Sequence, residues 1–123
     1  GKTIALWGLA FKAETDDMRE ATSLVTIRHL LEAGCTVRVF DPAAMDEARR
    51  RLGDAVIYAS DIYDAAKGAD ALLLLTEWKQ FRLPSWARVH DLMRSPIVFD
   101  GRNIYDPAEM RKNGFEYYSI GRK

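Results

Sequence analysis

Short, mostly apolar segments recur along this sequence, and stretches with helical character lie between them. Continuous apolar runs are typical of strands that are buried on both faces of a parallel sheet. The sequence predicts such strands at residues 3–11, 36–40, 71–76 and 97–100. Because strands and helices alternate with short connections, we expect an α/β fold, a doubly wound, mostly parallel sheet flanked by helices in a Rossmann-like three-layer αβα arrangement.

Helices are predicted between these strands. Leu24, Ile27 and Leu31 repeat at helical spacing, and Ala33-Gly34 follows, where glycine can take the left-handed conformation that ends a helix. Residues 77–93 are expected to be irregular to helical, with a break at Pro84. The other expected elements are a helix at 43–52, a short strand at 56–59, a helix at 61–67, a helix starting at Asp106-Pro107 and stopping at Asn113-Gly114, and a final alternating strand at 115–120.

Composition limits the class of protein. The chain has 123 residues, 48% of them hydrophobic, which suits one globular domain over residues 1–123. Its net charge is zero, which disfavours binding to a phosphate backbone. Its longest apolar run, residues 71–75, is far below the roughly 20 residues of a membrane span. We therefore expect no nucleic-acid partner and no membrane partner.

The reactive side chains give little sign of catalysis or metal binding. Cys35 is the one cysteine, so it cannot form an internal disulfide, and no Cys/His cluster could hold zinc. His29 and His90 have no matching serine or cysteine, which leaves nucleophilic catalysis unsupported. We expect no catalytic residue and no metal site in this chain, and a reducing, cytoplasmic location. Because the chain opens on Gly1, we also expect it to be a piece of a longer protein.

One edge of the predicted sheet is the expected ligand site. In open α/β sheets, ligands bind beyond the carboxyl ends of the strands, where the strand order reverses. This rule brings together residues 11–20, Asp41-Pro42, residues 76–78 and residues 100–103. The first segment lies in the stretch GLAFKAETDDMRE, which does not match the G-x-G-x-x-G fingerprint of dinucleotide-binding loops. A side chain, rather than bare backbone, must therefore hold a pyrophosphate here.

Two cations are candidates for that role. Lys12 leaves the end of the first predicted strand in front of a helix amino terminus, where the helix dipole and the ammonium group both favour an anion. Arg102, in the motif DGRN, leaves another strand end, and its planar fork suits a phosphate or the edge of a base. The alternative is that both are solvated surface cations.

The acidic residues near these cations allow several interpretations. The loop contains Glu14, Asp16, Asp17 and Glu20. Asp17 and Glu20 have the spacing of a capping box, and the other two could orient Lys12 or Arg19. A solvated loop is the alternative, and the intervening cations disfavour a metal site. Asp41 stands where a Rossmann enzyme binds a ribose hydroxyl, although the glycine loop that accompanies this role is missing.

Five motifs in order carry a family resemblance. They are GLAFKAETDDMRE, VFDP, LLLTEWKQF, FDGRNIYDP and GFEYYSIGR. In this order and spacing they resemble the C-terminal UDP-binding domain of the UDP-glucose/GDP-mannose dehydrogenase family over nearly the whole chain. The motifs TEW, at residues 76–78, and DGRNIYDP most resemble those of the bacterial UDP-glucose 6-dehydrogenase branch.

The resemblance implies an enzyme that oxidises UDP-glucose twice at C6, to UDP-glucuronate, while reducing two NAD. It implies that a preceding domain, outside this chain, binds most of the NAD and carries the catalytic cysteine, whose motif Cys35 does not match. Partners would be the UDP-sugar, that NAD-binding domain and, in the full-length protein, further copies in a homo-oligomer. The fragment alone is expected to be inactive.

The resemblance also assigns residue roles. Phe11 and Lys12 would contact the UDP-sugar, Arg102 would hold the substrate, and Arg19 would reach NAD on the other domain. Family members often have proline where this chain has Ala13 and Thr22. The loss of these prolines should make the unbound loop more flexible.

Other functions stay open at this point. The chain could belong to a related dehydrogenase that acts on GDP-mannose or UDP-N-acetylmannosamine. A phosphoacceptor signalling module shares the doubly wound sheet, but it would need an acidic pair where this chain has Phe11-Lys12. A module that only contributes an assembly surface is the third alternative.

Overall fold

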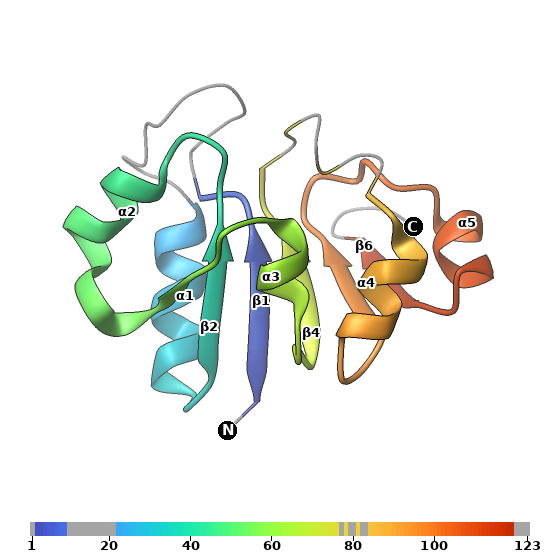
Figure 1. The fold of residues 1–123 in the computed structure, drawn as a ribbon, viewed down its shortest axis with the longest axis horizontal. Helices are drawn as coiled ribbons and strands as arrows, with labels where there is room; N and C mark the ends of the chain where they lie inside the picture. The colour runs from blue at the N-terminus through green and yellow to red at the C-terminus, as the bar shows by residue number, and fades with distance from the viewer. Residues whose placement is uncertain (1, 10–21, 77, 79–80, 82–83, 120–123) are drawn as a thin grey trace.

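The computed structural model describes residues 2–9, 22–76, 78, 81 and 84–119. Six strands form one sheet in the order β3-β2-β1-β4-β5-β6, and each neighbouring pair is parallel. The strands are β1 (Thr3–Trp7), β2 (Thr36–Phe40), β3 (Ile57–Tyr58), β4 (Ala71–Leu74), β5 (Ile97–Asp100) and β6 (Glu116–Ser119) (Figure 1). The helices are α1 (Thr22–Glu32), α2 (Met45–Leu52), α3 (Ile62–Ala66), α4 (Trp86–Leu92) and α5 (Pro107–Lys112), with a 3-10 turn η1 (Gly53–Ala55). The expected doubly wound α/β fold is confirmed.

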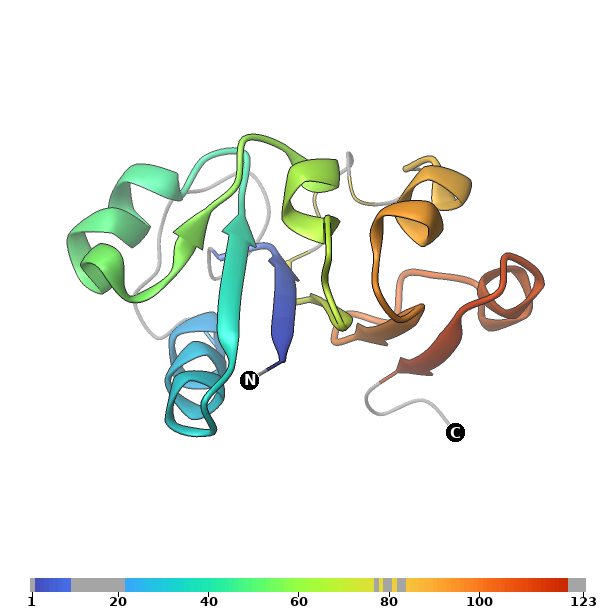
Figure 2. The same ribbon diagram turned by 60° about the horizontal axis from the view of Figure 1, so that its bottom comes forward.

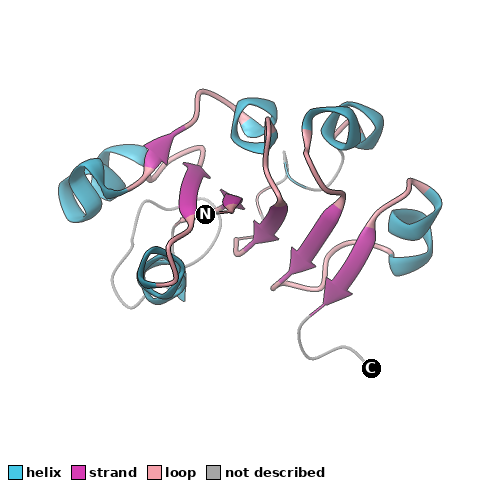
Figure 3. Ribbon diagram, turned by 90° about the horizontal axis from the view of Figure 1, so that it is seen from below, coloured by secondary structure: helices cyan, strands magenta, loops and turns pink. Residues whose placement is uncertain are grey.

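The helices lie on both faces of the sheet. Seen from below, α1 covers one face, and α3 and α4 cover the other (Figure 3). The view turned by 60° shows the same separation of α1 from α3 and α4 (Figure 2). The strand order explains it, because β1 to β2 and β4 to β5 step in opposite directions across the sheet. Right-handed crossovers then place their helices on opposite faces.

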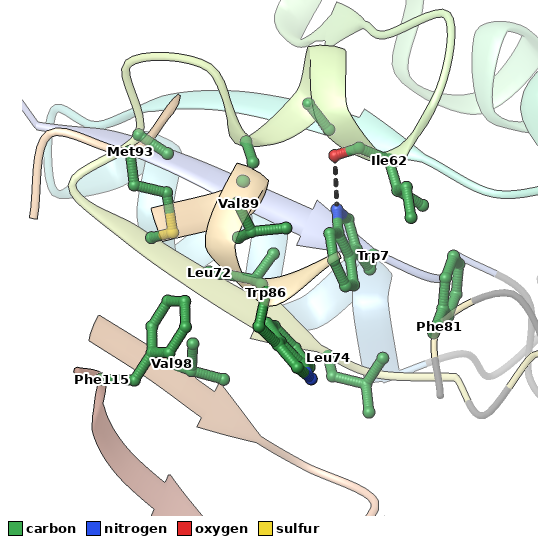
Figure 4. Packing of buried hydrophobic residues seen from close by; sticks show 14 of the residues in the cluster. Trp7, Ile62, Leu72, Leu74, Phe81, Trp86, Val89, Met93, Val98 and Phe115 are labelled. Carbon is green, nitrogen blue, oxygen red and sulfur yellow. Dashed lines mark hydrogen bonds between the residues drawn. The ribbon is translucent and has the colours of Figure 1, made fainter. Parts of the chain in front are cut away.

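The larger core lies under α3 and α4 and is rich in aromatic side chains (Figure 4). Trp7 of β1 is fully buried at its centre, and its indole Nε1 donates a hydrogen bond to the carbonyl oxygen of Ile62 at 3.1 Å. Its ring stacks on Phe81 and Trp86, with centroid distances of 5.6 and 6.1 Å. Burying aromatic rings of this size is the strongest apolar contribution available to a small domain.

The opposite face of the sheet is covered over only part of its width. One row of paired residues crosses it from Val39 through Leu6, Leu73 and Phe99 to Tyr118. Val39 and Leu6 are fully buried, whereas Phe99 and Tyr118 are 38% and 50% exposed. Among the described residues, helix α1 lies over β1 and β2 and no helix lies over β5 and β6 on this face, where the two exposed rings stack on each other at 5.1 Å.

The predicted strands at 36–40 and 97–100 are confirmed without change. The first strand is shorter than predicted, because it ends at Trp7 and not at Phe11. Gly8 follows with φ +100°, a left-handed conformation that turns the chain out of the sheet. The strand predicted at 71–76 ends at Leu74.

The predicted helices are present, with shifted starts. Helix α2 begins at Met45 instead of residue 43, and the N–H groups of Ala43 and Ala44, which precede it, donate to the carboxylate of Asp41. Helix α3 has Asp61 as its N-cap, whose side chain accepts a hydrogen bond from the N–H of Asp64. Within the described residues, no helix has the length and apolar character needed to cross a membrane.

Candidate functional site at the carboxyl edge of the sheet

All six strands point the same way, so the loops that follow them gather at one edge (Figure 1). The strand order reverses between β1 and β4, which is where open α/β sheets bind ligands. The described residues at this edge include Gly8 after β1, Asp41 after β2, Thr76 after β4 and Arg102 after β5. The described strand ends that the sequence analysis grouped together therefore lie at one edge of the sheet. The segment 10–21, with Phe11, Lys12 and Arg19, lies outside the described residues.

Where the strand order reverses, Gly8 and Gly101 are packed too closely against their neighbours to carry a side chain. A Cβ added to Gly8 would lie 2.5 Å from the Cβ of Thr76 and 2.6 Å from its backbone nitrogen. A Cβ added to Gly101 would lie 2.9 Å from the carbonyl oxygen of Leu74. These distances are below ordinary van der Waals contact, so the residues directly after β1, β4 and β5 pack closely against one another at this edge.

Asp41 serves the fold at this edge. It is 1% exposed, and its Oδ2 accepts the N–H of Leu9 at 2.7 Å. Its Oδ1 accepts the N–H groups of Ala43 and Ala44 at 2.8 and 2.9 Å. The carboxylate thereby joins the turn after β1 to the start of α2. This arrangement argues against the ribose-binding role considered for Asp41, because both oxygens face backbone donors inside the protein.

Asp100 organises the loop after β5 in a similar way. It is fully buried at the end of the strand, and its Oδ1 accepts the N–H of Arg102 at 2.9 Å. Its Oδ2 accepts the N–H groups of Ile104 and Tyr105 at 2.8 and 2.9 Å. The hydroxyl of Tyr117, on β6, donates to the same oxygen at 2.7 Å. The buried carboxylate of Asp100 therefore accepts three hydrogen bonds from the loop of the predicted site and one from β6.

Arg102 is the one predicted binding residue among the described residues. Its side chain is exposed, and the residue lies two positions after the end of β5. Asn103 follows with φ 58°, a left-handed conformation that completes the tight turn. An exposed guanidinium on an ordered backbone at the switch edge suits recognition of an anionic ligand.

The loops after β4 and β5 are joined to each other. The hydroxyl of Tyr105 donates a hydrogen bond to the carbonyl oxygen of Phe81, and both residues are buried. The hydroxyl of Tyr117 also lies 3.2 Å from the carbonyl oxygen of Tyr105. Sequence reasoning did not single out either tyrosine. The alternating pattern of β6 was the available signal, because it directs Tyr117 toward the α4 face of the sheet and Tyr118 toward the open face.

Comparison with known proteins decides the family. Residues 5–107 match the model of the UDP-glucose/GDP-mannose dehydrogenase family, UDP binding domain. This chain belongs to that family. The resemblance seen in the five motifs is thereby confirmed, and the match includes the candidate edge from Gly8 to the DGRN loop.

Relatives within the family agree with this assignment. The UDP-glucose 6-dehydrogenase of Pseudomonas aeruginosa is 50% identical over 127 residues, which cover 99% of this chain and 28% of that protein. The UDP-glucose 6-dehydrogenase YwqF of Bacillus subtilis is 47% identical over 123 residues, which cover 100% of this chain and 28% of that protein. The chain therefore spans little more than a quarter of the length of these relatives.

Solved structures of the family share the fold. A UDP-glucose dehydrogenase from the hyperthermophilic archaeon Pyrobaculum islandicum has a TM-score of 0.80 at 33% identity, covering 96% of this chain and 25% of that chain. The NDP-N-acetyl-D-galactosaminuronic acid dehydrogenase of Methanosarcina mazei has a TM-score of 0.82 at 28% identity, covering 100% of this chain and 25% of that chain. The two proteins differ in the sugar that their names give, so the fold alone does not distinguish the sugars.

Within the described part of the chain, no group of three or more His, Cys, Asp or Glu side chains lies close enough to hold a metal ion. The acidic residues of the loop at 14–20 fall outside that part of the chain. The described part of the site offers the exposed guanidinium of Arg102, a group that suits binding of a phosphate-containing ligand.

Proposed function

We propose that this chain is the UDP-binding part of an NAD-dependent UDP-glucose 6-dehydrogenase. The observation that carries the proposal is the family match over residues 5–107, together with the ordered DGRN loop at the switch edge of the sheet. The two relatives with 50% and 47% identity are both named UDP-glucose 6-dehydrogenases, which favours UDP-glucose over the other nucleotide sugars of the family.

The proposed binding site combines Arg102, which lies among the described residues, with Phe11 and Lys12, which lie outside them. Arg102 would place its planar guanidinium against the diphosphate, and Lys12 would supply a second, more compact positive charge. Phe11 would contact the UDP-sugar beside Lys12. Each charge-assisted hydrogen bond could contribute about 1.5–3 kcal/mol. Arg19 would reach toward NAD, most of which would be held by the part of the longer protein outside this chain.

The proposed reaction is the oxidation of the C6 alcohol of UDP-glucose to the carboxylate of UDP-glucuronate. NAD would accept the hydride in each of the two oxidations. The role of this chain is to hold and orient the substrate, while the cysteine that attacks the sugar would belong to the rest of the protein. We therefore expect the isolated chain to bind UDP and to have no dehydrogenase activity. The full-length protein would be a cytoplasmic homo-oligomer.

A titration of the isotopically labelled chain with UDP tests the binding site. UDP should shift the backbone amide resonances of Lys12 and Arg102 in a saturable way, whereas NAD alone should change them little. Arg102→Ala should weaken UDP binding about tenfold, which corresponds to the loss of about 1.4 kcal/mol. Arg111→Ala is the matched control, because Arg111 is an exposed arginine of α5, away from the switch edge. Absence of any response at millimolar UDP would contradict the proposal.

The choice among nucleotides needs a second measurement. Calorimetric titrations with UDP, UDP-glucose, UDP-N-acetylmannosamine and GDP-mannose should give binding to the uridine nucleotides and little heat with GDP-mannose. Stronger binding of GDP-mannose would instead favour the related branch of the family. Incubation with acetyl phosphate should give no phosphorylated protein, and labelling at an aspartate would favour the phosphoacceptor alternative.

A further inference from the structure

The loop that carries Arg102 is built around a buried charge. Burying a carboxylate in the interior is costly unless hydrogen-bond donors surround it. Among the described residues, Asp100 accepts hydrogen bonds from four donors, three of which are backbone N–H groups of the loop itself. Hydrogen bonds to an ionised acceptor are shorter and stronger than bonds between neutral groups. The loop conformation is therefore coupled directly to the ionised side chain of Asp100.

This coupling fixes the backbone from which the arginine extends. The N–H of Arg102 donates to Asp100, and the N–H of the preceding Gly101 donates to the carbonyl oxygen of Leu74 at 2.8 Å. Gly101 is thus bonded to the end of the neighbouring strand β4, and Arg102 to the last residue of β5. A long, exposed side chain that starts from a fixed backbone has fewer conformations to lose when it binds a ligand.

Tyr117 is the donor that reaches this carboxylate from outside the loop. It lies 17 residues away in sequence, on the neighbouring strand β6, and is 7% exposed. Its hydroxyl lies 2.7 Å from Oδ2 of Asp100. Tyr118, the next residue, faces the open side of the sheet and is 50% exposed. The two adjacent tyrosines therefore provide a test residue and a chemically identical control.

We propose that Asp100 and Tyr117 are positioning residues for nucleotide binding. Together they preset the backbone of Arg102 so that its guanidinium meets the diphosphate without first ordering the loop. The inference rests on the proposed function and deepens it, because it names residues that act on the ligand only through Arg102. Neither Asp100 nor Tyr117 is exposed enough to serve as the main contact of a ligand.

The first experiment compares Tyr117→Phe with Tyr118→Phe in the 123-residue chain, using UDP as the ligand. Tyr117→Phe should raise the dissociation constant for UDP about tenfold, because a loop that is binding-competent about a tenth of the time weakens apparent affinity by that factor. It should also speed hydrogen exchange of the Arg102 and Tyr105 amides. Tyr118→Phe should change neither quantity. Equal dissociation constants for the two variants would overturn the inference.

A double-mutant cycle separates positioning from general stability. If Tyr117 acts through Arg102, then Tyr117→Phe should change the UDP dissociation constant by less than about twofold in an Arg102→Ala background. A merely structural role would lower the melting temperature and leave two independent, multiplicative effects on binding, which would overturn the inference.

The same titrations distinguish failure of the proposed function from failure of the positioning role. If the unaltered chain fails to bind UDP, the proposed function fails and the positioning role falls with it. If the unaltered chain binds UDP and loses affinity in Arg102→Ala but not in Tyr117→Phe, only the positioning role is wrong. Hydrogen exchange and circular dichroism on each variant establish that a lost affinity is not the result of unfolding.

Discussion

Gly8 and Thr76 lie so close together that a Cβ on Gly8 would be 2.5 Å from the Cβ of Thr76. Thr76 is fully buried, so it has no free space into which it could move. The contact joins the ends of β1 and β4, the two strands between which the sheet changes direction. The candidate site is therefore built on a backbone contact that tolerates only glycine on one side.

This contact predicts a large effect of Gly8→Ala on stability. The new methyl group would overlap Thr76, and alanine would have to adopt φ +100°. We expect the free energy of unfolding, measured with urea, to fall by about 2–4 kcal/mol, from overpacking and left-handed strain together. Gly34→Ala is the control, because Gly34 has φ +84° but no heavy atom within 4 Å of the added Cβ. The idea is wrong if the two substitutions cost the same.

Asp41→Asn should destabilise the protein although it preserves the shape of the side chain. The amide group of asparagine would direct N–H donors toward at least one of the N–H groups of Leu9, Ala43 and Ala44. We expect a loss of about 1–3 kcal/mol in the free energy of unfolding at neutral pH. Asp46→Asn, at an exposed position in the first turn of α2, should cost no more than about 1 kcal/mol. A cost for Asp41→Asn no greater than that for Asp46→Asn would rule out this role.

The stability of the protein should depend on pH through Asp64. The N–H of Ser60 donates to this carboxylate and, with the nearby guanidinium of Arg38, lowers its pKa below the ordinary value of 3.8. A lowered pKa in the folded state means that ionised Asp64 stabilises the fold. This contribution is fully present above about pH 4 and is lost as the pH falls through the lowered pKa.

Urea unfolding between pH 2 and pH 7 tests this dependence. Asp64→Asn should make the acid side of the stability curve less steep, and the difference from the unaltered protein should shrink as the pH falls. Asp54→Asn is the control, because Asp54 is exposed in η1. Parallel curves for the unaltered protein and Asp64→Asn would contradict the assignment.

The stacked rings of Phe99 and Tyr118 should be energetically coupled. Their centroids lie 5.1 Å apart with an interplanar angle of 18° on the open face of β5 and β6. A cycle of alanine substitutions should give a coupling energy of about 0.5–1 kcal/mol. Phe99 and Ile57, which lies on β3 at the other edge of the sheet, provide the control cycle. Their effects should add to within about 0.5 kcal/mol, and equal coupling in both cycles would show that stacking contributes nothing.

Much of the fold could be predicted because its signals are local. The apolar runs at Thr36–Phe40 and Ile97–Asp100 became strands of those lengths, and Asp106-Pro107 and Asn113-Gly114 frame α5 as predicted. Each of these signals depends on a few neighbouring residues. They are a mostly apolar run, a capping side chain, and a glycine, Gly114, that adopts φ +89°. The edge of the sheet expected to bind the ligand followed from the rule that open α/β sheets bind ligands beyond the carboxyl ends of their strands.

The sequence by itself determined the order of the elements, the parallel sheet and the presence of Arg102 at its carboxyl edge. Only the tertiary structure decided where β1 ends, which groups Asp41 and Asp100 accept hydrogen bonds from, and that Tyr117 donates to Asp100. The physical reason is distance along the chain. Leu9 meets Asp41 across 32 residues and Tyr117 meets Asp100 across 17, and such contacts exist only after the sheet has brought separate strands together.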